Sequence, residues 1–434
     1  MKSEVRQRID QIRHGEVPRG YKKTKAGILP VDWTIYLIKD CLERVEHPVS
    51  VQADEMYTQI GIRSHGKGLF YKEPINGESL GKKAVFWIEP DCFVLNIVFA
   101  WEQAIGKTTQ NEVGMIGSHR FPMYRSVDGR IDIDYLIEYL MTKRGKDILE
   151  AASPGGAGRN RTLGQERFMK SKIILPTKSE QQKIAEIIKL QERVIELNSQ
   201  IIKQLELMKK ACLRKMFPEH GSSVPEVRFP GFTDPWEQRK LGDITERITR
   251  KNQDLESELP LTISAQYGLI DQNEFFDKRI ASKDVSGYYL VKKGEFAYNK
   301  STSSDAPWGA VKRLDRYEKG VLSTLYIVFS IWDTDKTNSD YLMTYYDTDL
   351  WHKGVKAIAA EGARNHGLLN ITPSDFFETT LLIPQDIEEQ KLIGKYFIQL
   401  DTLINLHQRK RDEEKQKKKA LMQLLFSGIV RVTV

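Results

Sequence analysis

The chain has only three cysteines and no long apolar run, and these two absences narrow its class. Cys41, Cys92 and Cys212 lie far apart in the sequence and are odd in number. Such spacing predicts neither a disulfide framework nor a zinc site, and it is typical of a reducing compartment. The chain begins with charged residues, and no apolar stretch approaches the length that spans a bilayer. We therefore expect a cytoplasmic protein with no membrane partner.

Signals for enzymatic chemistry are also lacking. Residues 61–67 nearly match a phosphate-binding loop, but Gly68 stands where Ser or Thr would bind magnesium, and residues 69–71 have the pattern of a strand. The histidines have no metal-ligand spacing, and no Asp-Pro-Pro-Tyr or Asn-Pro-Pro-Phe motif of an aminomethyltransferase is present. We predict that the chain binds no cofactor or metal and catalyses no reaction by itself.

The composition is that of an ordinary globular protein. With 434 residues, of which 40% are hydrophobic and 29% charged, the chain is long enough for two or three domains with real cores. The net charge of +7 is compatible with an anionic partner, but many proteins share such a charge. Composition alone therefore does not decide the function.

What the sequence does contain is a long internal repeat. Residues 174–184 (Ile-Leu-Pro-Thr-Lys-Ser-Glu-Gln-Gln-Lys-Ile) return as residues 382–392 (Leu-Ile-Pro-Gln-Asp-Ile-Glu-Glu-Gln-Lys-Leu), which aligns Glu180 with Glu388 and Gln182 with Gln390. A long charged helix is expected after each copy, and the helix ends, 209–217 and 418–426, also match. Two globular modules, each followed by a long helix, indicate a device that holds two similar modules apart.

The two modules begin alike and continue with short strand-like segments broken by Gly and Asn. Residues 33–40 align with 236–243, which pairs Trp33 with Trp236 as core anchors. We predict an α+β fold, in which each module has a small mixed or antiparallel sheet with helices. The other similar segments are 64–69 with 264–269, 81–86 with 288–295, 99–101 with 296–298, and the expected helices 133–141 with 339–346.

The first long helix, expected at 179–216, has apolar residues three and four apart in a heptad seam that includes the polar Asn198. The seam consists of Ile184, Ile187, Gln191, Val194, Asn198, Ile201, Leu205, Met208 and Cys212, widened by Ile188, Ile195 and Ile202. The second, expected at 387–426, is apolar at both ends but almost wholly charged over 408–419. We predict an antiparallel coiled coil whose register Asn198 fixes. The alternative is that each helix packs on its own module.

Two glycine-containing basic loops, residues 155–161 and 362–367, occupy matching places near the end of each module. Arg and Asn side chains pair with base edges, and glycine lets the backbone approach a phosphate. Solvated surface turns remain an alternative for these loops, and interleaved acidic residues favour a solvated face for the basic run at 409–419. The predicted DNA-binding residues are Arg63, Ser64, His65 and Lys67; Arg159, Asn160 and Arg161; Ser264, Gln266 and Tyr267; Asn299, Lys300 and Ser301; and Arg364, Asn365 and His366.

This pattern resembles the specificity subunits of type I restriction–modification systems. Residues 20–33 are similar to the N-terminal segment of these subunits, and residues 235–243 to the start of their second recognition domain. The repeated segments 174–184 and 382–392 resemble the entries to their two conserved helices. The resemblance implies a domain order that covers the whole chain: an N-terminal segment (1–20), a first target recognition domain (21–178), a central conserved helix (179–217), a second target recognition domain (218–386), a distal conserved helix (387–427) and a C-terminal tail (428–434).

The resemblance also implies a function and a set of partners. Each recognition domain would read one half of an asymmetric bipartite site in double-stranded DNA, and the paired helices would set the gap. Two methyltransferase subunits would carry S-adenosylmethionine, and restriction subunits with translocase activity would use ATP and Mg²⁺. The alternatives are a stand-alone bipartite DNA-binding regulator without methylase partners and a scaffold that binds only proteins. A protein-only scaffold predicts no salt-dependent affinity for DNA.

Overall fold

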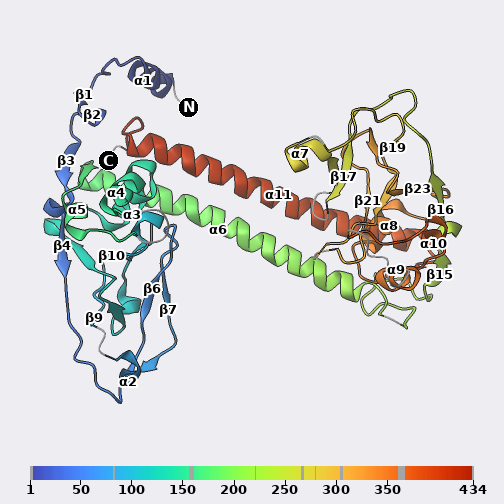
Figure 1. Cartoon of the computed structure of the whole chain (residues 1–434), viewed down its shortest axis with the longest axis horizontal. Helices are drawn as coiled ribbons and strands as arrows, with labels where there is room; N and C mark the ends of the chain where they lie inside the picture. Colours follow the sequence, from blue (N-terminus) through green and yellow to red (C-terminus); the bar gives the residue numbers. More distant parts are fainter. Residues whose placement is uncertain are drawn as a thin grey trace. The chain divides into compact units, whose positions relative to one another are not determined.

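The computed structural model describes residues 3–81, 84–155, 161–219, 221–264, 268–278, 280–303, 306–359 and 367–432. The chain divides into two compact units, of which unit 1 comprises Met1–Asn198 with Lys410–Val434, and unit 2 comprises Ser199–Arg409. Both boundaries fall inside the long helices α6 (Lys178–Lys215) and α11 (Ile387–Phe426) (Figure 1). Each unit therefore contains one half of each long helix. Within the described residues, no helix combines the length and apolar character that a bilayer crossing requires.

Unit 1 is built around an antiparallel four-stranded sheet in the order β11 (Ile105–Lys107), β10 (Phe93–Leu95), β13 (Met123–Ser126) and β4 (Leu42–Val45). Unit 1 also contains two-stranded antiparallel pairs: β1 (Tyr21–Thr24) with β2 (Gly27–Pro30), β3 (Thr34–Leu37) with β14 (Lys172–Leu175), β5 (Met56–Tyr57) with β8 (Ile75–Asn76), β6 (Ile60–Ile62) with β7 (Leu69–Tyr71), and β9 (Val85–Trp87) with β12 (Ile116–Ser118). Its shorter helices are α1 (Ser3–Arg13), α2 (Gly77–Leu80), α3 (Ile133–Met141), α4 (Lys143–Ala152) and α5 (Gln165–Met169).

Unit 2 has a sheet of the same order, formed by β21 (Ala310–Arg313), β20 (Phe296–Asn299), β23 (Ile327–Ile331) and β16 (Thr245–Ile248). Its two-stranded pairs are β15 (Glu237–Lys240) with β24 (Thr380–Ile383), β17 (Leu261–Ser264) with β18 (Gly268–Asp271), and β19 (Tyr289–Lys292) with β22 (Lys319–Leu322). Its shorter helices are α7 (Gln272–Phe276), α8 (Ser339–Tyr345), α9 (His352–Ile358) and α10 (Pro373–Phe377). The predicted α+β class with two similar modules is confirmed.

The shared sheet order fixes which residues correspond in the two modules. Strand β10 takes the place of β20, so Phe93 corresponds to Phe296 with the same shift of 203 that relates Trp33 to Trp236. The predicted match of 99–101 with 296–298 is therefore wrong. Residues 100–102 instead form a short 3₁₀ turn, η2 (Ala100–Glu102), which follows β10. The match rested on the similar triplets Phe-Ala-Trp (99–101) and Phe-Ala-Tyr (296–298), which do not obey the shift of 203 between the tryptophans.

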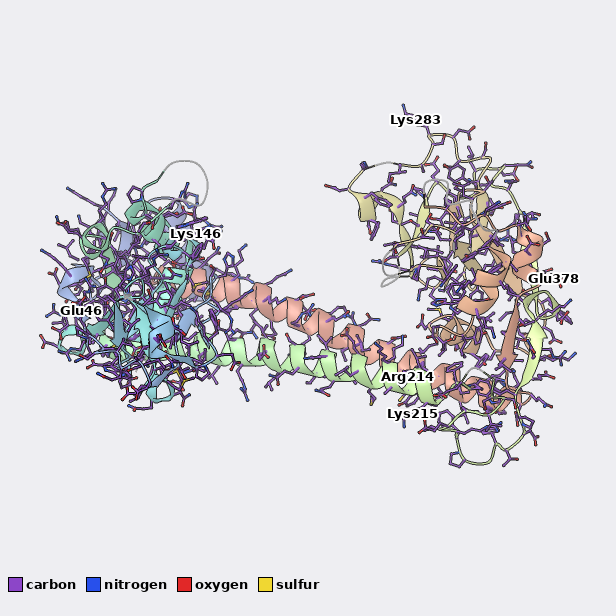
Figure 2. All side chains as sticks on the ribbon, turned by 60° about the horizontal axis from the view of Figure 1, so that its bottom comes forward. Glu46, Lys146, Arg214, Lys215, Lys283 and Glu378 are labelled. Carbon is purple, nitrogen blue, oxygen red and sulfur yellow. The ribbon has the colours of Figure 1, made fainter. Side chains whose placement is uncertain are left out.

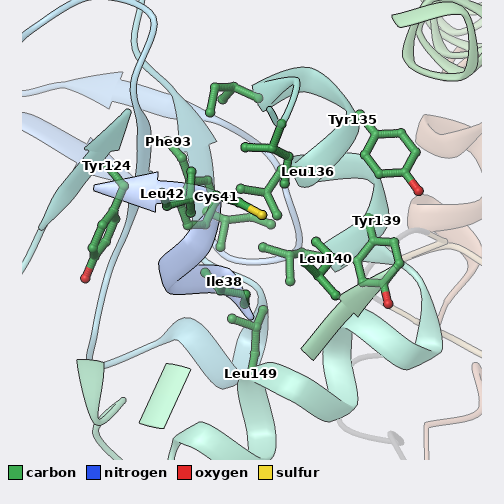
Figure 3. Close-up of a cluster of buried hydrophobic side chains, with 14 of the residues drawn as sticks. Ile38, Cys41, Leu42, Phe93, Tyr124, Tyr135, Leu136, Tyr139, Leu140 and Leu149 are labelled. Atoms are coloured by element: carbon green, nitrogen blue, oxygen red, sulfur yellow. The ribbon is translucent and has the colours of Figure 1, made fainter. Parts of the chain in front are cut away.

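Each module packs a tyrosine-bearing helix onto the strand that leads into its long helix. In unit 1 the hydroxyl of Tyr135 on α3 donates to the carbonyl of Ile174, at 3.3 Å, and in unit 2 Tyr341 on α8 donates to that of Leu382, at 2.7 Å. Figure 3 shows Tyr135 and Tyr139 projecting from α3 on the side of the unit 1 core away from Tyr124. The buried aromatic helix thus ties each sheet to the start of a long helix.

Buried polar residues at the start of the long helices define the repeat more closely than the sequence does. Glu180 and Glu389 are only 2% and 1% exposed. The side chain of Gln181 donates to the carbonyl of Pro176, at 3.1 Å, and that of Gln390 donates to Pro384, at 2.9 Å. The predicted pairing of Glu180 with Glu388 and of Gln182 with Gln390 is therefore wrong by one residue. The adjacent Glu-Gln-Gln and Glu-Glu-Gln triplets allowed either alignment.

The long helices pair with each other inside each unit. In unit 1 the amide of Gln191 on α6 hydrogen-bonds Glu414 on α11, and in unit 2 the amino group of Lys209 binds the carboxylate of Asp401, at 2.8 Å. The first half of α6 thus meets the last half of α11, and the reverse holds in the other unit. The predicted antiparallel pairing is confirmed, and both helices have nearly their predicted bounds.

The buried face of α6 differs from the predicted seam at alternate positions. Ile184 and Asn198 are buried as predicted, but Val194, Ile201 and Met208 are exposed. The buried register instead passes through Ile188, Ile195 and Ile202, the residues predicted only to widen the seam. Both registers have heptad spacing, so the choice depends on the partner helix. The charged run of α11 lies partly in contact with α6, where Lys418 binds Glu192.

Candidate nucleic-acid interface

The first candidate site is the loop between strands β6 and β7 in unit 1. The guanidinium of Arg63 donates to the carbonyl of Leu69, at 2.7 Å, and lies over the ring of Phe70, 5.0 Å from its centroid. His65, Gly66 and Gly68 have positive φ angles of 61°, 64° and 72°. This left-handed backbone produces the tight turn that Gly favours. Lys67 is exposed at the loop. The near-match to a phosphate-binding loop is thus a hairpin turn that does not precede a helix.

The turn η2 is hydrogen-bonded to this hairpin loop. The hydroxyl of Ser64 donates to the carboxylate of Glu102, at 2.9 Å, and the backbone amide of His65 donates to the carbonyl of the same residue, at 2.8 Å. The neighbouring Trp101 carries the guanidinium of Arg161 over its indole ring, 5.4 Å from the centroid. A single turn therefore brings the hairpin loop together with the end of the first basic loop. Arg159 and Asn160 lie outside the described residues.

In unit 2 the segment 299–301 lies beside the end of the second basic loop. The backbone amide of Leu369 donates to the carbonyl of Lys300, at 3.0 Å, and the amide of Thr302 donates to that of Gly367, at 2.8 Å. The amino group of Lys300 also donates to the carbonyl of Ile371, at 3.3 Å. The structure thus places Lys300 and Thr302 beside the segment 367–371, which directly follows His366. Arg364, Asn365 and His366 lie outside the described residues.

The hairpin of unit 2 differs from that of unit 1. Ser264 is largely buried and pairs with Gly268 at the end of the β17–β18 ladder, while Gln266 and Tyr267 lie outside the described residues. The amide oxygen of Asn299 accepts a hydrogen bond from the backbone of Ser301, at 3.0 Å, so this side chain shapes its own turn. Among the predicted residues of unit 2, Ser264 and Asn299 therefore have local structural roles.

Sequence reasoning missed three residues of this region. Asn96 corresponds to Asn299, because its amide oxygen likewise accepts from the backbone amide two residues on, that of Val98, at 3.1 Å. The shift of 203 between the tryptophans would have found it. Trp101 and Glu102, which hold Arg161 and the hairpin loop, had no signal in the repeat, because the sequence has Ser and Asp at the same shift.

The chemistry of these surfaces is that of binding through hydrogen bonds and positive charge. Arg63, Lys67, Arg161 and Lys300 supply cationic donors, and Ser64 and Ser301 supply hydroxyl groups. Arginine reads guanine edges and phosphates through paired donors. Among the described residues, no group of His, Cys, Asp and Glu has the arrangement of a metal site.

In unit 2 a buried cluster of charges links the module to the long helix α6. In unit 2 Asp347, which lies just beyond α8, binds Lys209 of α6 at 2.9 Å and Lys312 of β21 at 2.7 Å. Burial opposes ionisation of Asp347, but these two lysines outweigh it and hold the pKa of Asp347 below its ordinary value. A buried carboxylate between two cations resists separation of the three groups, because loss of either cation would leave a buried charge without compensation.

Residues 90–207 match the family model of the type I restriction modification DNA specificity domain. A curated protein described as the putative type I restriction enzyme MjaX specificity subunit of Methanocaldococcus jannaschii is 23% identical over 446 aligned positions. The match covers 95% of this chain and 97% of that protein.

Two solved structures have a similar fold. One comes from a study of complex assembly and conformational transition of the type I R-M system, with 17% identity, a TM-score of 0.51, and coverage of 93% of this chain and 99% of that one. The other is the type I restriction–modification S subunit from M. genitalium, with 11% identity, a TM-score of 0.50, and coverage of 93% and 97%. The fold is therefore shared, and the resemblance drawn from the sequence is confirmed.

Proposed function

We infer that this chain is the DNA specificity subunit of a type I restriction–modification system, a non-catalytic member of its complex. The observation that supports this most directly is the repeat of one module around two long helices, combined with the family match over residues 90–207. A chain built this way can contact two separate stretches of DNA with related but non-identical surfaces.

We propose that each module reads one half of an asymmetric bipartite site. The loops differ in chemistry, since unit 1 presents Arg63 and Lys67 on a hairpin and Arg161 on an indole ring, whereas unit 2 presents Lys300 beside its basic loop. Different donor sets favour different bases. We propose that Arg159, Asn160, Arg364, Asn365 and His366 also contact the DNA. Support comes from the described ends of the two basic loops, since Arg161 lies over Trp101 and Gly367 accepts a hydrogen bond from Thr302.

We propose that the paired helices set the gap between the half-sites, with Asn198 contributing to their register. Helix α6 has 38 residues, which at a rise of 1.5 Å per residue is about 57 Å. Asn198 is buried, and its amide donates to the carbonyl of Val194 within the same helix, at 2.8 Å. A polar residue in a coiled-coil seam disfavours shifted registers because a shift would leave it against apolar side chains.

We propose two methyltransferase subunits as partners, with S-adenosylmethionine bound on them, and restriction subunits that use ATP and Mg²⁺, all in the cytoplasm. Support comes from apolar side chains that α6 leaves exposed within unit 1. Leu190, Val194 and Leu197 are 61%, 38% and 42% exposed and are spaced four and three residues apart, which places them on one helix face. Such a stripe suits a further helix from another protein.

The test is the adenine methylome of the host, measured by single-molecule sequencing with and without this gene. Loss of one asymmetric, gapped motif upon deletion, and its return upon complementation, is expected. The decisive control is the double variant Leu190→Ser/Leu197→Ser. The purified variant should still bind DNA, but complementation with it should not restore methylation in the host. An unchanged methylome, with the methyltransferase shown to be expressed, would contradict the proposal. Tight specific binding without any change in methylation would favour the stand-alone regulator.

A further inference from the structure

A groove in unit 1 lies between the α3–α4 turn and the C-terminal end of α11. It has a volume of about 490 Å³. Its floor is apolar, because Tyr139 and Phe426, whose ring centroids are 6.0 Å apart, are joined there by Met141 and Met422. The remaining lining residues are Thr142, Lys143, Arg144, Lys415, Lys418, Lys419, Gln423 and Ser427.

The rim of this groove is strongly cationic. Five of its lining residues are Lys or Arg, and none of the residues described as lining it is acidic. Lys418 is compensated by Glu192 and, at 3.8 Å, by Glu138, and Lys415 lies 3.6 Å from the exposed Asp412. Arg144 donates to the carbonyl of Ala26, at 3.1 Å. Within the described part of the chain, Lys143 and Lys419 have no ion pair, and both are exposed.

The repeat provides an internal comparison, because unit 2 has a groove at the corresponding place. Phe217 packs on Tyr345 there, with centroids 6.4 Å apart, as Phe426 packs on Tyr139. This groove has a volume of about 510 Å³, but its charged lining residues are two bases and three acids: Lys210 and Arg214, and Glu219, Asp347 and Asp349. The two grooves therefore share a framework and differ in charge.

We propose that the unit 1 groove binds an acidic amphipathic segment of a partner protein. The apolar floor would accept apolar side chains of the segment, and Lys143 and Lys419 on the rim would pair with its carboxylates. Duplex DNA fits less well, because a phosphate backbone gains nothing from an apolar floor. The corresponding groove of unit 2 would not bind the same segment, so the two repeats present unlike docking surfaces.

The proposed binding of an acidic segment to the groove does not depend on which DNA sequence the chain recognises. Only the assignment of the acidic segment to a methyltransferase or restriction subunit rests on the proposed function. Two separate readouts therefore distinguish the two ideas. Salt-dependent binding of the full chain to duplex DNA tests the DNA role, and binding of a defined peptide tests the groove.

The experiment uses the purified full chain and a fluorescent synthetic peptide that repeats Leu and Glu in a helical pattern, beside a matched peptide with Gln in place of Glu. The acidic peptide should bind, the Gln peptide should bind far less, and Lys143→Glu/Lys419→Glu should weaken binding on the order of tenfold. The matched control, Lys210→Glu/Arg214→Glu in unit 2, should leave the affinity unchanged.

Three results would overturn the inference. They are absence of binding by the acidic peptide, equal binding of the acidic and Gln peptides, and equal effects of the two double variants. Displacement of the peptide by non-specific duplex DNA, with the same sensitivity to Lys143→Glu/Lys419→Glu, would assign the groove to nucleic acid instead. The substituted lysines are exposed, and circular dichroism would verify that each variant is folded.

Discussion

The guanidinium of Arg431 binds the buried carboxylate of Glu180 through two hydrogen bonds of 2.8 Å, although 251 residues separate them. Arg228 binds Glu389 in the same way, at 2.6 and 2.8 Å. The arginine that follows α11 thus holds the start of α6, and the arginine that follows α6 holds the start of α11. Each long helix is therefore fixed at its N-terminus by the chain that has just left the other helix.

Removing the arginine should destabilise one unit only. Arg431→Ala leaves the carboxylate of Glu180 buried without its charged partner, which should cost unit 1 about 3 kcal/mol. Its other acceptor, Asp32, is partly exposed and can rehydrate. Amide hydrogen exchange of the core of unit 1 measures the loss, and the core of unit 2 serves as the internal reference.

Two further variants make this prediction specific. Arg228→Ala should reverse the pattern, with the loss confined to unit 2. Arg239→Ala breaks a surface pair with Glu237 and should cost less than about 1 kcal/mol. If Arg431→Ala behaved like Arg239→Ala, the buried pair would not hold the helix start.

The corresponding tryptophans should respond differently to the same substitution. The indole N–H of Trp33 donates to the carboxylate of Glu180, at 3.0 Å, whereas the buried N–H of Trp236 has no hydrogen-bond partner among the described residues. Trp33→Phe therefore loses a hydrogen bond to a charged acceptor, and Trp236→Phe loses none. Unit 1 should lose about 2 kcal/mol more than unit 2, as measured by hydrogen exchange. Equal losses would mean that ring volume alone matters.

Much of the fold could be predicted from the sequence because the chain repeats itself. The Ile-Leu-Pro and Leu-Ile-Pro landmarks and the two tryptophans located the modules, and the charged heptads located α6 and α11. The register of the seam could not be predicted, because α6 has apolar residues on more than one face. Only the position of α11 decides between Ile195, which is partly buried, and Val194, which is exposed.

The candidate surfaces were predictable only in part. The basic loops were visible as glycine with Arg and Asn, but the groups that hold them come from elsewhere in the chain. Glu102 accepts a hydrogen bond from Ser64 of the hairpin loop, although the two residues are 38 positions apart in the sequence. No local sequence pattern predicts this contact. Tertiary contacts of this kind depend on the path of the intervening strands, which the sequence specifies only through packing.

The stability of unit 1 should depend on pH through Glu138. Burial, followed by the carboxylate of Glu192, raises the pKa of Glu138 to about 7, and the opposing effect of Lys418 is smaller. A raised carboxyl pKa means that the folded state binds the extra proton. The contribution of the protonated Glu138 to the stability of unit 1 is therefore complete at a pH below about 4.3, the pKa of Glu in an unfolded chain. This contribution is lost as the pH rises towards 7.

Replacing this carboxyl should remove that dependence. Glu138→Gln should stabilise unit 1 at pH 8 by about 1–2 kcal/mol relative to the native chain, and the difference should shrink towards pH 5. Glu150→Gln removes a more exposed carboxylate from the same unit and is the matched control. Unfolding measured across this range checks the sign, and a Gln variant that was less stable at pH 8 would contradict it.

Arginine and lysine at the two surfaces should each affect one half-site. Arg161→Ala removes the cation over Trp101 in unit 1, and Lys300→Ala removes a cation beside the basic loop of unit 2. If Arg161 makes a bidentate contact with a base edge, the loss should be about 1–3 kcal/mol at the first half-site only. The same holds for Arg159→Ala, and for Arg364→Ala at the second half-site.

Competition binding measures this once the methylome has given the motif. Each variant is titrated with duplexes in which one half-site is scrambled, at fixed salt concentration. The Arg161→Ala chain should no longer discriminate against scrambling of the first half-site, while it keeps full discrimination at the second, and Lys300→Ala should do the opposite. A uniform loss across all duplexes would instead indicate a phosphate contact without a role in reading sequence, because backbone contacts are insensitive to the base pairs they flank.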